Sequence, residues 1–216
     1  MKKGFIFDAD GTLLDSMKIW DEIVQRFLTP RGKVTNPELE KIVASMSIEE
    51  GVLYIKNYFS LNENPDEMKN EILGILDEFY RSEVELKTGV KEFLELCSKN
   101  KIPMCVASAG NTKILVQAFT RLGINQYFTK IYSCSDYGDD KHQPTIYLKC
   151  AEDFNSTPEN MVVFEDALIP VRTAKNAGFY VVGIKDSFSS KDENKIRSLC
   201  DLFIEDFTEL KLEEIL

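Results

Sequence analysis

The sequence predicts a Rossmann-like, doubly wound α/β core with a parallel sheet, into which a small α-helical bundle is inserted. From residue 86 onwards, short apolar runs typical of buried strands alternate with helical segments. Between residues 16 and 86 every periodic stretch is helical, without strand-like alternation. We therefore expect a core domain of residues 1–15 and 87–216 and an inserted helical cap domain of residues 16–86.

The first element is a short apolar run over residues 3–8, which is typical of a buried parallel strand. It stops at two carboxylates one residue apart, Asp8 and Asp10, followed by Gly11. Residues two apart in a strand point to the same side, so the two carboxylates converge if the strand stops near Asp8 and Gly11 turns the backbone. Crowded carboxylates need a cation or a shared proton, which makes this stretch a candidate catalytic site.

The inserted segment opens with a helical stripe of apolar residues at positions 20, 23, 24, 27 and 28, which ends near residues 30–32. We expect Asp15 or Ser16 to cap this helix. Further helices are expected after residue 36, over residues 48–59 and after residue 65. Two interpretations of residues 47–51 stay open: the run faces the active site from the inserted segment, or Ser47 only caps a helix together with Glu50.

The alternating part of the chain supplies the remaining strands, which we expect at residues 103–107, 130–133, 161–164, 180–184 and 202–204. The helices between them are expected at residues 90–97, 112–122, 145–154 and 171–177. Gly123 and Gly178 follow two of these helices, in the position where glycine commonly ends a helix. In open parallel sheets ligands bind outside the carboxyl ends of the strands, so the residues after each strand are the candidates for chemistry.

Polar residues follow four of the strands. They are Asp8 and Asp10 after the first, Ser108, Ala109, Gly110 and Asn111 after the second, Lys141 after the third, and Glu165 and Asp166 after the fourth. Carboxylate oxygens suit Mg²⁺, which also takes water and substrate phosphate oxygens. An ammonium group, a hydroxyl and backbone amides can stabilise a transferring phosphoryl group, and a carboxylate can act as its nucleophile. Asn111 either contacts the phosphate or only caps the next helix.

The composition excludes several other classes of protein. The formal net charge is -10 and no basic stripe is visible, so we expect no nucleic-acid partner. The single histidine, His142, excludes histidine-cluster metal sites. The five cysteines are scattered through apolar runs and indicate reduced core residues. Without an apolar leader or a run of membrane-spanning length, we expect a cytoplasmic protein that contacts no membrane.

Four stretches of the chain, in order and spacing, resemble the motifs of the haloacid dehalogenase-like (HAD) hydrolase superfamily. They are residues 7–16, residues 106–108, Lys141 three residues before Pro144, and residues 164–166 followed by Ala174 and Ala177-Gly178. The insertion after the first motif resembles the small helical cap of that superfamily. The nearest subgroup is the one that holds sugar-phosphate phosphatases and β-phosphoglucomutase, and the resemblance covers essentially the whole chain.

The resemblance implies a role for each motif residue. Asp8 would be the nucleophile and a Mg²⁺ ligand, and Asp10 the general acid and base, with its carbonyl on the metal. Ser108 and Lys141 would hold the phosphate. The remaining implied site residues are Asp166 as a metal ligand, Glu165 beside the metal or bridged to it by water, Thr12 as an orienting residue of the acidic loop, and Thr12, Ala109 and Asn111 as candidates for substrate binding.

Two positions depart from the mutases of this subgroup. Those enzymes place a histidine and an arginine in the cap, where this chain has Trp20 and Ile48. The resemblance therefore implies a Mg²⁺-dependent phosphatase that hydrolyses a small phosphorylated metabolite of the sugar-phosphate class. The alternatives are a β-phosphoglucomutase-type isomerase and, as the weakest, a catalytically silent protein that binds such metabolites. A monomer is the default expectation for its oligomeric state.

Overall fold

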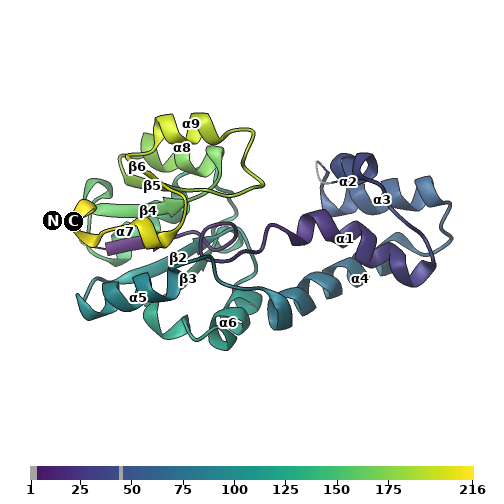
Figure 1. The fold of residues 1–216 in the computed structure, drawn as a ribbon, viewed down its shortest axis with the longest axis horizontal. Coiled ribbons are helices and arrows are strands. Elements are labelled where there is room, and N and C mark those ends of the chain that lie inside the picture. Colours follow the sequence, from purple (N-terminus) through teal and green to yellow (C-terminus); the bar gives the residue numbers. More distant parts are fainter. Residues whose placement is uncertain (1–3, 44–45) are drawn as a thin grey trace. The chain divides into compact units, whose positions relative to one another are not determined.

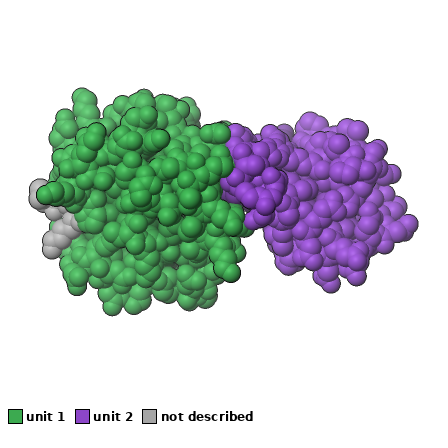
Figure 2. All heavy atoms as spheres, turned by 90° about the horizontal axis from the view of Figure 1, so that it is seen from below, with its two compact units in different colours: residues 1–16, 84–216 green, residues 17–83 purple. Residues whose placement is uncertain are grey.

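The computed structural model describes residues 4–43 and 46–216. The chain divides into an α/β unit, residues 1–16 and 84–216, and a helical unit, residues 17–83 (Figure 2). The sequence predicts that the core resumes at residue 87, whereas residues 84–86 already belong to the α/β unit. Leu86 forms a β-bridge with Leu14, and the Asp15 backbone N–H donates to the carbonyl of Glu85 at 2.9 Å.

The α/β unit is built on a six-stranded sheet in the order β3-β2-β1-β4-β5-β6 (Figure 1). Its strands are β1 (Gly4–Phe7), β2 (Met104–Ser108), β3 (Ile131–Ser133), β4 (Met161–Glu165), β5 (Tyr180–Ile184) and β6 (Leu202–Ile204). All five strand pairs are parallel. The chain moves outward from β1 in one direction and from β4 in the other, which confirms the predicted doubly wound fold and places its switch point between β1 and β4.

Alternate residues of the central strands lie on opposite faces of the sheet, because successive strand side chains point in opposite directions. On one face, Ile6 and Val163 join a core with residues of the helices α7 (Thr145–Asp153), α8 (Leu168–Asn176) and α9 (Glu193–Leu199). On the other face, Phe7 stacks on Phe164 with ring centroids 4.3 Å apart, and both rings contact Phe93 of α5 (Val90–Lys99). The α/β unit also contains helix α6 (Thr112–Arg121). Because the central strands are buried on both faces, their sequences are continuous apolar runs.

The helical unit contains α1 (Ile19–Leu28), α2 (Pro37–Val43), α3 (Ile48–Phe59) and α4 (Pro65–Glu78), which runs into a π-helical turn over Phe79–Glu83. The Ser47 side chain accepts from the Glu50 N–H, and the Glu50 carboxylate accepts from the Ser47 N–H at 2.9 Å. This capping box supports the second interpretation of Ser47. The expected cap of α1 is wrong: Lys18 occupies that position, and Ser16 instead donates its hydroxyl to Asp10 Oδ1 at 2.7 Å.

The five cysteines are free thiols, and four of them are buried, as the sequence predicts for reduced core residues. Within residues 4–43 and 46–216, no helix combines the length and the apolar character that crossing a membrane requires.

Candidate active site

The loop after β1 turns sharply at Gly11, which has a φ of +82°. A Cβ atom at this position would lie 2.5 Å from Asp166 Oδ2, so both the backbone angle and the neighbouring carboxylate require glycine. The Leu13 and Leu14 N–H groups close the loop by donating to the Ala9 carbonyl at 3.0 and 2.8 Å. The turn thereby brings the acidic loop against the residue that follows β4.

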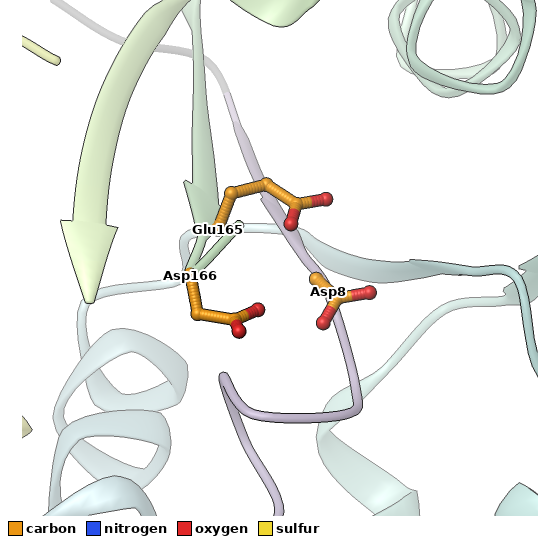
Figure 3. Close-up of side chains that lie close together, drawn as sticks. All are labelled: Asp8, Glu165 and Asp166. Carbon is orange, nitrogen blue, oxygen red and sulfur yellow. The ribbon is translucent and has the colours of Figure 1, made fainter. Parts of the chain in front are cut away.

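Three buried carboxylates meet at this edge of the sheet: Asp8 after β1, Glu165 at the end of β4, and Asp166 (Figure 3). One oxygen from each lies within 4.8 Å of the others. Burial, and then the negative charges of Asp8 and Glu165, raise the pKa of Asp166 well above its usual range. A divalent cation relieves this cost, and the all-oxygen donor set fits Mg²⁺.

Lys141 is the positive group in contact with this cluster. Its ammonium group donates to Asp8 Oδ1 and to Glu165 Oε1, the latter at 2.6 Å. Burial by itself would lower the pKa of Lys141, but the charges of Asp8 and Glu165 outweigh burial and raise that pKa above its ordinary value. Lys141 therefore stays charged, while Lys130 and Lys149 pair elsewhere, with Asp153 and Glu152.

Ser108, Gly110 and Asp10 form the second part of the candidate site. The Gly110 N–H donates to Ser108 Oγ at 2.8 Å, and its carbonyl accepts from the Ser133 hydroxyl at 3.0 Å. A Cβ atom at position 110 would lie 3.2 Å from Ser108 Oγ and 3.3 Å from Asp10 Oδ2. The hydroxyl and the carboxylate thus converge on a glycine backbone, where no side chain blocks the approach of a ligand.

The structure gathers most of the residues expected from the sequence. Asp8, Glu165, Asp166 and Lys141 are in contact or nearly so, as described above, and the Thr12 hydroxyl joins them by donating to Asp166 Oδ1 at 3.2 Å. Asn111 is exposed and accepts from the Lys113 N–H at 2.9 Å, which is the contact of a helix cap. Ala109 is exposed beside it, and neither side chain joins the acidic cluster in the contacts described.

Several residues around the site are missed by the sequence interpretation. They are Ser16, Lys87, Ser133, Tyr147 and Asp186. Asp186 follows β5 by two residues, so the rule that chemistry gathers at the carboxyl ends of strands could have found it. Tyr147 lies in the apolar pattern of α7, and Lys87 lies in a short connection. The partners of their polar atoms are far away in the sequence and become neighbours only through tertiary packing.

A doubly wound sheet with a buried acidic cluster and a lysine at its carboxyl edge defines a class of enzymes that act on small ligands. Residues 5–184 match the family model described as haloacid dehalogenase-like hydrolase, so the chain belongs to this family of hydrolytic enzymes. The match confirms the resemblance carried by the four motifs.

Individual proteins are similar over most of the chain. A phosphorylated carbohydrates phosphatase of Thermotoga maritima is 26% identical over 173 residues, which cover 80% of each chain. The fructose-1-phosphate phosphatase YqaB of Escherichia coli is 24% identical and covers 84% of this chain and 96% of its own length. A crystal structure from Thermotoga maritima, of a protein assigned as a β-phosphoglucomutase, matches with a TM-score of 0.89 and 24% identity over 99% of this chain and 100% of that chain. This last likeness concerns the fold alone.

Proposed function

We propose that the protein is a Mg²⁺-dependent phosphatase that hydrolyses a small phosphomonoester of the sugar-phosphate class through an aspartyl-phosphate on Asp8. The observation that carries the proposal is the buried cluster of Asp8, Glu165 and Asp166 with Lys141 in contact with it. The phosphorylated carbohydrates phosphatase and the fructose-1-phosphate phosphatase among the relatives support the substrate class.

In the first step an Asp8 carboxylate oxygen bonds to phosphorus as the bond from phosphorus to the ester oxygen breaks, and the Asp10 carboxyl donates its proton to the leaving oxygen. In the second step Asp10 takes a proton from water, whose oxygen bonds to phosphorus. The bond between phosphorus and Asp8 then breaks and releases inorganic phosphate. Ser16 favours this division of roles, because its hydrogen bond at 2.7 Å fixes the Asp10 carboxyl group.

The remaining residues stabilise charge in this scheme. Asp8 and Asp166 would hold Mg²⁺, with Glu165 beside it, and the bound ion would supply positive charge to the phosphoryl oxygens. Lys141 supplies a second positive charge to the phosphoryl group. Its hydrogen bonds to Asp8 and Glu165 hold the ammonium group beside the nucleophile. The Ser108 hydroxyl offers a hydrogen bond to a phosphoryl oxygen, and the missing side chain at position 110 leaves room beside it.

The isomerase alternative requires a phosphorylated hexose to be held at two ends, which calls for a cation outside the acidic cluster. Trp20 and Ile48 instead line a cavity of about 50 Å³ within the helical unit. The described residues that line it carry no charge. This favours hydrolysis. Incubation with β-glucose 1-phosphate decides the matter: free phosphate is the expected product, and glucose 6-phosphate without free phosphate would establish the isomerase.

The test of the proposal is Mg²⁺-dependent release of phosphate from a generic aryl phosphate, followed by a screen of sugar, polyol and nucleotide phosphates. Asp8→Asn is expected to keep the circular dichroism spectrum and thermal unfolding of the wild type and to lose turnover. Unchanged turnover in Asp8→Asn would refute the proposal. Tight binding of phosphate esters by the wild type without release under any Mg²⁺ condition would instead establish a silent binding protein.

A further inference from the structure

Lys87 makes an unusual set of contacts for a residue in a short connection. Its ammonium group donates to the Gly11 carbonyl at 2.8 Å, to Asp186 Oδ2 at 2.9 Å and to the Lys185 carbonyl. Its backbone N–H donates to the Leu13 carbonyl at 3.0 Å. One residue is therefore bonded twice to the acidic loop and twice to the segment that follows β5.

These contacts use the full hydrogen-bonding capacity of the lysine. An ammonium group has three N–H donors, and each of the three finds an oxygen here. The side chains of Lys87 and Asp186 are only 13% and 4% exposed. A charge pair so far removed from water is held in a defined geometry, because loss of one partner leaves the other charge buried and uncompensated.

The position of the Gly11 carbonyl controls how the acidic loop lies against Asp166. Gly11 lies between Asp10 and Thr12, its Cα packs against the Asp166 carboxylate, and the Thr12 hydroxyl donates to that same carboxylate. A hydrogen bond to the carbonyl fixes the peptide plane that joins Gly11 to Thr12. Its loss frees the loop to move relative to Asp166.

We propose that Lys87, held in place by Asp186, is a positioning residue for the proposed phosphoryl transfer. It anchors the Gly11 carbonyl and so fixes the distance of Asp8 and Asp10 from Asp166. The inference rests on the proposed function for its catalytic consequence, whereas the anchoring itself concerns only the loop. A displacement of reacting groups by about 1 Å costs up to about a hundredfold in rate, so the effect belongs in kcat.

The experiment compares Lys87→Met, which keeps the length of the side chain without its charge, with Lys87→Arg, which keeps the charge. Lys175→Met is the matched control. Lys175 forms a partly buried ion pair with Asp201 at 2.7 Å on α8, and it has no contact with the acidic loop among those described. Two readouts are used: kinetics with an aryl phosphate at saturating Mg²⁺, and hydrogen–deuterium exchange of the peptide that spans residues 9–14 in metal-free protein.

For Lys87→Met we expect kcat to fall at least about tenfold with KM within about twofold, and exchange at residues 9–14 to accelerate. Lys87→Arg should recover most of the wild-type kcat and most of the wild-type protection at residues 9–14. Lys175→Met should match the wild type in kcat and in exchange. Wild-type kcat and exchange in Lys87→Met, or an equal loss in Lys175→Met, would overturn the inference.

Asp186→Asn keeps the test decisive if Lys87→Met does not fold. It removes the negative charge that holds the Lys87 ammonium group and should accelerate exchange in the same peptide, and unchanged exchange there would contradict the anchoring. In a double variant, Lys87→Met with Asp186→Asn should lose no more kcat than Lys87→Met alone, because both changes break one anchor. Absence of phosphatase activity in the wild type would refute the proposed function, while the exchange measurement would still decide the anchoring.

Discussion

The Tyr147 hydroxyl donates a hydrogen bond to Glu165 Oε1 over 2.6 Å, and both residues are almost fully buried. The same oxygen accepts from the Lys141 ammonium group. Tyr147 lies on α7 and Glu165 at the end of β4, so the packing of this helix on the sheet brings a neutral donor to a carboxylate of the candidate metal site. Burial raises the pKa of Glu165, while Lys141 and the tyrosine hydroxyl favour its charged form.

Tyr147→Phe should therefore destabilise the protein by more than the removal of an ordinary hydroxyl. A hydrogen bond to a charged group contributes about 1.5–3 kcal/mol, and the ring itself keeps its packing on Phe179 at 6.1 Å. The matched control is Tyr132→Phe, whose hydroxyl donates at 2.7 Å to Asp153. Asp153 is also a carboxylate, but it is exposed, so water solvates it when the bond is lost, whereas the buried Glu165 is left with one hydrogen-bond donor fewer. Urea unfolding should show a loss of about 2 kcal/mol for the first and less than about 1 kcal/mol for the second. Equal losses would show that the buried contact has no special weight.

Mg²⁺ should stabilise the folded protein even without substrate. Four carboxylates are buried in this region, on Asp8, Glu165, Asp166 and Asp186, and the ammonium groups of Lys141 and Lys87 pair with three of them, Asp8, Glu165 and Asp186. With all four carboxylates ionised, the two ammonium groups leave an excess of two negative charges. A ligand that binds only the folded state adds about 2.7 kcal/mol at a hundred times its dissociation constant. Thermal unfolding after EDTA treatment, repeated across a MgCl₂ titration, measures this gain.

Asp166→Asn separates metal binding from a general salt effect. The substitution removes one of the crowded charges, so the metal-free variant should melt above the metal-free wild type, because burial and like charges disfavour the ionised form of Asp166. Mg²⁺ should then give it little further stabilisation. If Mg²⁺ raised the unfolding temperature of this variant as much as that of the wild type, Asp166 would not be a metal ligand. Asp153→Asn, at an exposed position, serves as the control.

Gly11→Ala should be far more damaging than a glycine substitution at another left-handed position. Gly123 has a φ of +71° and open space around its missing Cβ, so Gly123→Ala meets only the left-handed backbone cost of about 1–2 kcal/mol. Gly11→Ala meets the same cost, and its Cβ would also lie 2.5 Å from Asp166 Oδ2. We expect a larger loss of unfolding free energy for Gly11→Ala and loss of the Mg²⁺ shift. Equal losses with the Mg²⁺ shift retained would show that the loop moves away from Asp166 at little cost.

The fold could be predicted from the sequence because its central strands are buried on both faces. Burial of this kind leaves continuous apolar runs, and the helices between them keep their own periodicity. The start of α1 was missed for a physical reason. Ser16 suits a helix cap by local chemistry, yet its hydroxyl bonds to Asp10 six residues earlier in the chain, so a site contact replaces the cap.

The acidic part of the site followed from one rule, that ligands gather at the carboxyl ends of parallel strands. Asp8, Glu165 and Asp166 each lie at such an end and do meet. Tyr147 and Lys87 could not be found in this way. The first belongs to an apolar helical stripe and the second to a connection, and their partners depend on how α7 and the loop after β5 pack in three dimensions.

The thiols provide a prediction about pH. Burial raises the pKa of Cys97 on α5 to about 12, well above the value of about 9 for an exposed thiol. A group whose pKa is raised by folding stabilises the folded state below the unfolded pKa, and this contribution is lost as the pH rises from about 9 to about 12. Native protein should therefore react slowly with a disulfide reagent at pH 8, chiefly at the half-exposed Cys200, and unfolded protein should react at all five cysteines. Rapid reaction of Cys97 in the native state, identified by peptide mass, would show that α5 opens far more readily than its buried face implies.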